Sequence, residues 1–265
     1  MSAESGADVL TRVAKHVEKR LEKHKRAHPV EALRAGELYA RAPADFAKAF
    51  DGKGPRVIAE VKFASPSEGL LRERPTAQDA VAVAGGYLSA AAAELSVLTE
   101  RNFFAGDFEY LAAIRRAHPE AFLLMKDFFF DPYQFELARS LGADCVLLIA
   151  ALVGPALAAL QERARALGLS VLVEVHDEKE MEVAKACGAA LIGVNSRDLK
   201  TLKTDLGVAR RLAPLGRGAL LIAESGLKTR GDLDELSALG YRGFLIGTSL
   251  MKRPDPGAAL QELLS

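Results

Sequence analysis

From Arg56 onward, short apolar runs alternate with longer stretches of helical period, and this alternation limits the possible folds most strongly. The apolar runs are rich in leucine and β-branched residues, which is typical of strands. Strands that alternate with helices form parallel sheets with right-handed crossovers, so the sequence predicts an α/β fold. The expected strands are Arg56–Val61, Ala93–Leu98, Phe122–Lys126, Asp144–Ile149, Ser170–Glu174, Leu191–Asn195, Ala219–Ala223 and Gly243–Ile246.

Eight strands, each followed by a helix, predict a closed (β/α)8 barrel, the TIM barrel fold. Asp107, Asp131 and Asp177 are expected N-caps, and glycines follow several helix ends. The alternative is an open doubly wound sheet, but its dinucleotide-binding form carries G-x-G-x-x-G, which the sequence lacks. The expected helices are Thr76–Gly86, Asp107–Ala117, Pro132–Leu141, Pro155–Leu167, Glu178–Cys187, Leu206–Leu212, Arg230–Leu239 and Pro256–Leu263.

Residues 1–55 precede the first strand and are expected to form an N-terminal helical extension of a barrel that spans residues 56–265. Within the extension, Ala7–Arg26 has the pattern of an amphipathic helix. Barrels of about 200–250 residues form one domain. The chain has 265 residues, 49% of them hydrophobic, and no long linker follows the extension, so a single domain over residues 1–265 is expected.

Charge balance and the lack of targeting patterns exclude several classes of function. Lys+Arg and Asp+Glu both number 35, so no basic surface for nucleic acid is expected. The N-terminus lacks the apolar core of a signal peptide, and no apolar stretch approaches the ~20 residues of a membrane span. Cys145 and Cys187 fit small side chains in a reducing compartment, which favours a cytoplasmic location. The histidines show no ligand-like spacing, so no metal site is expected.

Polar residues gather where the expected strands end, and in this fold those ends form one mouth that holds the active site. By strand alternation, Glu60 and Lys62 face the same side as Ile58. Three cations and three carboxylates are therefore expected to converge, which suits acid–base chemistry or a structural ion network. The polar strand ends are Glu60 with Lys62, Lys126, Glu174, Asn195 with Arg197, and Glu224.

Small residues follow the last two expected strands, in the stretches AESG (residues 223–226) and IGTS (residues 246–249). Barrels commonly bind phosphate after these two strands. Glycine N–H groups can approach phosphate oxygens closely, and a helix N-terminus adds a favourable field. The two stretches together predict a phosphate site, with tight strand-to-helix turns as the alternative explanation.

Five stretches, in order along the chain, match one known family: IAEVKFASPSEG, LSVLTERNFFAGDFEYL, LLMKDFFFDPYQFELARSLGADCVLLI, LVEVHDEKEMEVAKACGAALIGVNSRDLKTLKTDL and LIAESGLKTRGDLDELSALGYRGFLIGTSLM. In them the chain resembles indole-3-glycerol-phosphate synthase, a barrel enzyme of tryptophan biosynthesis. The resemblance implies a carboxy-lyase that converts 1-(2-carboxyphenylamino)-1-deoxyribulose 5-phosphate to indole-3-glycerol phosphate, carbon dioxide and water. It implies a phosphorylated small molecule as partner and no cofactor.

The resemblance also implies roles for single residues. Lys126 matches the catalytic lysine, a general acid toward the ketone oxygen during ring closure. Glu174 and Lys62 match the residues that move protons in the dehydration, and their division into acid and base stays open. Glu60 matches a glutamate that positions the lysines. Asn195 and Glu174 match residues that hold the hydroxyl and anilino groups of the substrate. The other matches are substrate contacts at Ser65, Arg197 and Glu224, a slot for the aromatic ring at Phe103, Phe128 and Leu148 (with a plain core role as the alternative for Leu148), and a phosphate grip at Ser225, Gly226, Gly247 and Thr248.

The chain departs from the family pattern in the loop after the first strand. Phe63 and Glu68 stand where basic residues are common, which bears on substrate affinity rather than on the reaction. Thr248 replaces a common serine and keeps the hydroxyl. One alternative function, phosphoribosylanthranilate isomerase, uses a Cys/Asp pair at strand ends, and neither cysteine lies at one. The other, a barrel that binds phosphorylated ligands without catalysis, would lose the acid–base residues found here. Nothing demands an obligate assembly, so a monomer is expected.

Overall fold

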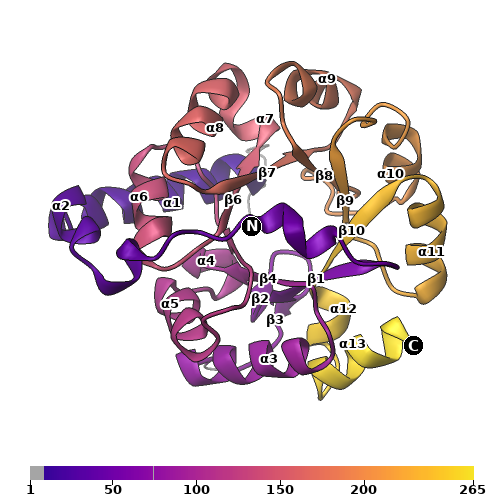
Figure 1. Ribbon diagram of the computed structural model, residues 1–265, viewed down its shortest axis with the longest axis horizontal. Coiled ribbons are helices and arrows are strands. Elements are labelled where there is room, and N and C mark those ends of the chain that lie inside the picture. The colour runs from indigo at the N-terminus through magenta and orange to yellow at the C-terminus, as the bar shows by residue number, and fades with distance from the viewer. Residues whose placement is uncertain (1–8, 74) are drawn as a thin grey trace, which may run out of the picture.

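Eight parallel strands close into a barrel in the computed structural model, which describes residues 9–73 and 75–265 (Figure 1). The order around the barrel is β1, β10, β9, β8, β7, β6, β5 and β4, and β4 pairs again with β1. The predicted (β/α)8 barrel is confirmed. The strands are β1 (Arg56–Val61), β4 (Glu94–Leu98), β5 (Leu123–Lys126), β6 (Cys145–Ile149), β7 (Ser170–Val175), β8 (Leu191–Asn195), β9 (Leu220–Glu224) and β10 (Tyr241–Ile246).

Alternate residues of each strand divide the core between the barrel interior and the helix layer. Ile58, Leu172 and Ile222 point inward and belong to one apolar cluster that fills the barrel. Outward residues such as Val57 and Val173 pack with the helices in a larger cluster. Side chains that continue the inward series at the carboxyl end of a strand therefore enter the mouth of the barrel.

Helices on the outside of the sheet connect successive strands, as the sequence pattern predicted. Asp107 and Asp177 accept hydrogen bonds from backbone N–H groups of the first turns that they precede, so these two of the three expected caps are confirmed. The third is wrong by one residue: Pro132 is the N-cap of α6, and Asp131 before it accepts from the N–H of Tyr133. No helix in the described ranges is both long enough and apolar enough to cross a membrane. The helices are α3 (Ala77–Ser89), α5 (Phe108–Ala117), α6 (Tyr133–Ser140), α8 (Leu157–Ala166), α9 (Glu178–Ala186), α10 (Gly207–Leu212), α11 (Arg230–Ala238) and α13 (Pro256–Leu264).

Several short elements at the mouth were not predicted, because segments of two to four residues are too short to show a period. One of them, α4, is stabilised by a capping side chain and shows no hydrophobic period. The Glu100 carboxylate accepts hydrogen bonds from three backbone N–H groups of this helix. The short elements are the antiparallel hairpin β2 (Ala64–Ser65) and β3 (Gly69–Leu70), the helices α4 (Arg101–Phe104), α7 (Ala150–Val153) and α12 (Thr248–Met251), and the 3-10 turn η3 (Gly154–Ala156).

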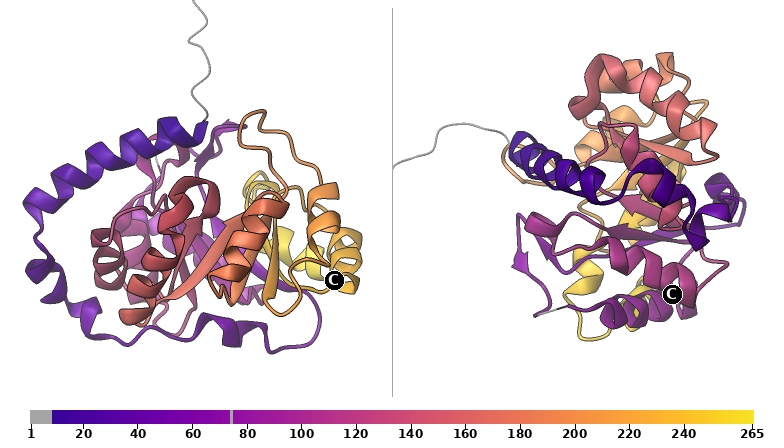
Figure 2. Two further views of the ribbon diagram at one scale, coloured as in Figure 1. Left: turned by 90° about the horizontal axis from the view of Figure 1, so that it is seen from above. Right: turned by 90° about the vertical axis from the view of Figure 1, so that its left-hand side faces the viewer.

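The N-terminal extension runs past both ends of the barrel (Figure 2). Its first helix lies beside the mouth, where Leu10 lines the main cavity. Phe46 and Phe50 belong to the apolar cluster of the barrel interior, and the N–H of Phe46 donates to Ser170 at the start of β7. The expected helix is confirmed from Val9 onward, and its first two residues lie outside the described part. The elements are α1 (Val9–Ala27), α2 (Val30–Arg34), η1 (Glu37–Ala40) and η2 (Phe46–Phe50).

Ion pairs attach the extension to the barrel. Arg20 lies 2.6 Å from Asp127, and its guanidinium also donates to the carbonyl of Thr99 at 2.6 Å. Arg41 lies 2.7 Å from Asp144, whose side chain is buried. Buried ion pairs with additional hydrogen bonds hold their partners in one geometry. The remaining two pairs join Lys25 to Asp131 and Arg34 to Glu136.

Candidate active site

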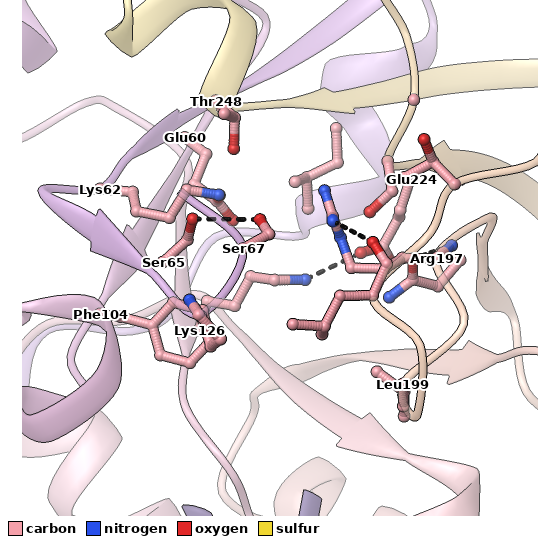
Figure 3. A pocket seen from close by; sticks show the side chains of 18 of the residues that line it. Glu60, Lys62, Ser65, Ser67, Phe104, Lys126, Arg197, Leu199, Glu224 and Thr248 are labelled. Carbon is pink, nitrogen blue, oxygen red and sulfur yellow. Dashed lines mark hydrogen bonds and ion pairs between the residues drawn. The ribbon is translucent and has the colours of Figure 1, made fainter. Parts of the chain in front are cut away.

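A cavity of about 1150 Å³ opens at the carboxyl ends of the strands (Figure 3). This is the face on which active sites of the fold lie. The predicted convergence of the polar strand ends on one mouth is confirmed. The predicted site residues that line the cavity are Glu60, Lys62, Ser65, Lys126, Phe128, Glu174, Asn195, Arg197, Glu224, Ser225, Gly226, Gly247 and Thr248.

Lys126, the last residue of β5, lies between two carboxylates in this cavity. Its Nζ is 2.8 Å from Oε2 of Glu224 and 3.3 Å from Oε2 of Glu174. Burial alone would lower the pKa of Lys126, but the carboxylates of Glu224 and Glu174 outweigh burial and raise that pKa. Lys126 is therefore a protonated donor, held in place from two sides and aimed into the cavity.

The two carboxylates beside Lys126 have different surroundings. Burial would raise the pKa of Glu174, but Lys126 and His176 hold it well below its ordinary value. Oε1 of Glu174 also accepts a hydrogen bond from Nδ2 of Asn195 at 3.1 Å. Burial raises the pKa of Glu224, although Lys126 acts in the opposite direction. At neutral pH Glu174 is a carboxylate, whereas Glu224 accepts a proton more readily.

Two glycines make room for the buried acids. A Cβ atom on Gly193, in β8, would collide with Oε1 of Glu224. A Cβ atom on Gly247, after β10, would collide with the Glu60 carboxylate. Among the described residues, Oε1 of Glu224 has no hydrogen-bond partner, and it is buried against Gly193.

A second lysine–glutamate pair stands at the end of β1. Nζ of Lys62 lies 2.6 Å from Oε1 of Glu60, and both side chains are largely buried. Figure 3 shows this pair on the same side of the cavity as Ser65 and Ser67. Lys62 and Lys126, at the ends of β1 and β5, are thus two largely buried ammonium groups of the site, each paired with carboxylate.

The predicted phosphate grip forms one wall of the cavity. Ser225 and Gly226 both have positive φ, 65° and 85°, which folds the chain sharply after β9. Gly247 and Thr248 begin the short helix α12 after β10. The small side chains leave backbone N–H groups accessible to an anion. In Figure 3, Thr248 lies at the far end of the cavity from Phe104 and Leu199.

The expected aromatic slot needs two corrections. Leu148 faces the helix layer, because it shares strand parity with Val146, and the cavity is lined by its neighbours Leu147 and Ile149. Phe103 lies outside the cavity and packs edge-on against His16 of α1, with ring centroids 5.3 Å apart.

Phe104, one residue later on α4, lines the cavity together with Phe128, and the two rings lie 6.1 Å apart. An apolar slot therefore exists, but Phe104, Leu147 and Ile149 take the places given to Phe103 and Leu148. Alternation along β6 could have separated Leu147 from Leu148 in the sequence, whereas no sequence signal orients α4.

The loop after β8 fixes the backbone around Arg197. The backbone N–H of Arg197 donates to Oδ1 of Asn195 at 3.0 Å, and the Arg197 guanidinium donates to the carbonyl of Leu202 at 2.8 Å. Lys252 was missed by sequence reasoning: it lines the cavity beside α12 and lies 2.6 Å from Glu68 in the loop after β1. No sequence pattern joins positions so far apart.

His176 was missed as well. It follows β7 with the same parity as Glu174, and its Nε2 lies 3.2 Å from Oε1 of Glu174. Extending the alternation of β7 by two residues beyond Glu174 would have predicted that His176 faces the same side. In the part of the chain that the structure describes, no three His, Cys, Asp or Glu side chains are grouped as a metal site.

Comparisons with known proteins agree with this geometry. The family model for indole-3-glycerol phosphate synthase matches residues 10–263. The chain is 43% identical over 265 residues to the indole-3-glycerol phosphate synthase of Rhodospirillum rubrum, covering 97% of this chain and 99% of that one. It is 45% identical over 212 residues to that of Carboxydothermus hydrogenoformans, covering 79% of each.

Solved structures share the fold at lower identity. A 3-hexulose-6-phosphate synthase superposes with a TM-score of 0.64 at 18% identity, covering 80% of this chain and 98% of the other. The 3-hexulose-6-phosphate synthase from Salmonella typhimurium superposes with a TM-score of 0.64 at 14% identity, covering 78% of this chain and 96% of the other. These likenesses concern the barrel alone. By the family model and its relatives, the chain belongs to the indole-3-glycerol phosphate synthase family.

Proposed function

We propose that the chain converts 1-(2-carboxyphenylamino)-1-deoxyribulose 5-phosphate into indole-3-glycerol phosphate, carbon dioxide and water, with Lys126 as the principal acid. The observation that carries this proposal is a buried ammonium between two carboxylates, at the centre of a mouth that is apolar at one end and glycine-rich at the other. A substrate with an aromatic ring and a phosphate matches those two ends.

Ring closure is the first step. The ring carbon that bears the carboxylate attacks the ketone carbon, and negative charge develops on the ketone oxygen. Lys126 donates a proton to that oxygen, which stabilises a charge present only in the transition state. Carbon dioxide then leaves, and its bonding electron pair restores the aromatic ring. Glu174 and Glu224 keep Lys126 protonated and oriented until the substrate arrives.

Dehydration completes the pyrrole ring. The hydroxyl leaves as water with a proton from a general acid, and a base removes a proton from the carbon beside the nitrogen. Glu174 is ionised at neutral pH and therefore acts as the base. Lys62, paired with Glu60, acts as the acid. Asn195 holds Glu174 by the hydrogen bond to its Oε1.

The substrate is placed by the remaining wall residues. Its phosphate binds at Ser225, Gly226, Gly247 and Thr248, and its aromatic ring enters the slot of Phe104, Phe128, Leu147 and Ile149. Arg197 and Ser65 meet its other anionic or polar groups, and Glu224, which lines the same cavity, faces a hydroxyl. A monomer working in the cytoplasm without a cofactor is part of the proposal, supported by the balanced charge of the chain and its two free cysteines.

The test is turnover by the purified chain. The substrate is supplied in buffer with EDTA and no nucleotide, and indole-3-glycerol phosphate is followed by its fluorescence. Product at a rate proportional to enzyme concentration is expected. Tight binding of the substrate with no product at any pH would replace this proposal with a barrel that only binds phosphorylated ligands.

A further inference from the structure

His176 is held between two carboxylates just outside the cavity. Its Nε2 lies 3.2 Å from Oε1 of Glu174, and its Nδ1 lies 3.1 Å from Oε2 of Glu180. The backbone N–H of His176 donates to the same oxygen of Glu180 at 2.8 Å. The imidazole is 14% exposed and does not line the cavity, so it does not touch a substrate bound there.

We propose that His176 is a positioning residue of the reaction: as an imidazolium fixed by Glu180, it keeps Glu174 ionised and holds the carboxylate oxygen that Lys126 does not meet. The proposal rests on the role given above to Glu174 as the base of the dehydration. The contact with Glu174 acts through charge, because its geometry is an ion pair rather than an aligned hydrogen bond.

Charge balance in the mouth gives the reason for a cation at this place. Glu174 and Glu224 share one ammonium group, Lys126, so these three buried groups carry an excess of negative charge when all are ionised. Buried charge without a partner is costly, and a carboxylate in such a group takes up a proton instead. A second cation behind Glu174 favours its ionised form, which is the form a base needs.

In the described part of the chain, the charged groups paired with the imidazole are both carboxylates. On β7 and α9 the charged groups that face it are Glu174 and Glu180, and on β8 Asn195 contacts Glu174 from the other side. Helix α7, which packs against β7 and α9, contributes only the apolar residues Ala150–Val153.

The carboxylate of Glu180, which holds His176 in place, is stabilised by its position in helix α9. Glu180 lies in the first turn of α9, where the helix N-terminus stabilises negative charge. Burial alone would lower the pKa of His176, but Glu174 and Glu180 raise it to about 10. The imidazolium therefore persists through neutral pH.

The experiment replaces the charge and keeps the shape. In His176→Gln the side chain retains a donor but loses the positive charge, so Glu174 takes up a proton more readily. The low-pH fall of kcat is expected to move to higher pH by about 1 unit, with kcat on the alkaline side largely retained. Glu180→Gln should move the low-pH fall of kcat in the same direction, by a smaller amount than His176→Gln does. His118→Gln, at a histidine outside the cavity, is the matched control and should leave the profile in place.

A uniform loss of kcat at all pH values in His176→Gln, with no shift of the profile, would show that the side chain only fills space and would overturn the proposal. A second measurement needs no variant: the ring nitrogens of the histidines in the unmodified protein are titrated by NMR. His176 is expected to stay protonated above pH 8, and deprotonation near pH 6.5 would overturn the proposal. This titration decides the matter even if His176→Gln fails to fold or if the wild-type chain forms no product.

Discussion

Buried acids occur at two levels of the barrel interior, and their surroundings give them different charges. Glu174, at the mouth, has cationic neighbours and is ionised. Glu94, at the start of β4, is fully buried, and neither of its carboxylate oxygens has a hydrogen-bond partner among the described residues. Burial raises the pKa of Glu94 well above its ordinary value, so this side chain is a neutral acid in the core.

Replacing Glu94 should stabilise the protein. In Glu94→Met a side chain of similar shape has no polar group to bury, and a gain of about 1–3 kcal/mol in the free energy of unfolding is expected at pH 8. The gain should be smaller at pH 5, because the unfolded chain releases the Glu94 proton above about pH 4.5 while the folded chain keeps it, so wild-type stability falls as pH rises.

Urea unfolding of both proteins at pH 5 and pH 8 measures this difference. An equal gain at the two pH values would mean that Glu94 is ionised in the folded chain. A loss of stability would mean that its carboxyl group has partners that the structure does not show.

At the scale of elements, an ion pair ties the loop after β1 to the end of α12. Glu68, in the turn between β2 and β3, pairs with Lys252 after α12 at 2.6 Å. Both side chains line the cavity and both are partly exposed. Lys252 lowers the pKa of Glu68 below its ordinary value. Lys252 lies one turn after Thr248, so the pair occupies a cation beside the proposed phosphate site.

Releasing Lys252 should tighten substrate binding. In Glu68→Gln the lysine is free to meet the phosphate, and KM is expected to fall by about 2–5-fold, the range of an exposed ion pair, with kcat nearly unchanged. The effect should shrink in high salt. Glu73→Gln, an exposed acid of the same loop, is the control for net charge. An unchanged or raised KM in Glu68→Gln would show that the pair orders the loop for binding instead.

The long elements could be predicted from the sequence, because strands and helices of this length carry a clear hydrophobic period. β10 shows the limit: it begins at Tyr241 rather than Gly243, since a register shift separates these residues. Alternation along β1 also placed Glu60 and Lys62 correctly in the mouth.

The wrong or missing predictions concern side chains whose position depends on tertiary contacts rather than on a hydrophobic period in the sequence. Phe103 and Phe104 are adjacent on a single helical turn capped by Glu100, and of the two rings that of Phe104 lines the cavity. Lys252 reaches the cavity through its pairing with Glu68, far away in the sequence. The Lys252–Glu68 pair joins two loops that meet only in the tertiary structure.

At the scale of the whole molecule, Asp144 joins the extension to the barrel. Its Oδ1 lies 2.7 Å from the Arg41 guanidinium and accepts from the N–H of Ala44, and its Oδ2 meets Arg115 of α5 and the N–H of Leu123. Neither Asp144 nor Arg115 is more than 1% exposed. Such a link favours folding of extension and barrel as one unit.

Breaking this link should destabilise the whole chain. Asp144→Asn leaves two guanidinium groups without their carboxylate, and a loss of about 3–5 kcal/mol is expected. Unfolding by urea, followed by far-UV circular dichroism and by tyrosine fluorescence, should show one coincident transition in both proteins. Asp234→Asn, which removes an exposed pair within α11, should cost under about 0.5 kcal/mol. Two separate transitions in the wild-type chain would contradict folding as one unit.

In the proposed reaction Lys126 supplies the proton for ring closure, and single-turnover kinetics of Lys126→Ala test this role most directly. The ammonium acts on charge that develops in the transition state, so kcat is expected to fall by about 10³-fold or more while substrate Kd changes little. Lys179→Ala, at an exposed lysine of α9, is the control and should turn over normally. Near-normal turnover by Lys126→Ala would contradict the account and assign the proton to another group in the mouth.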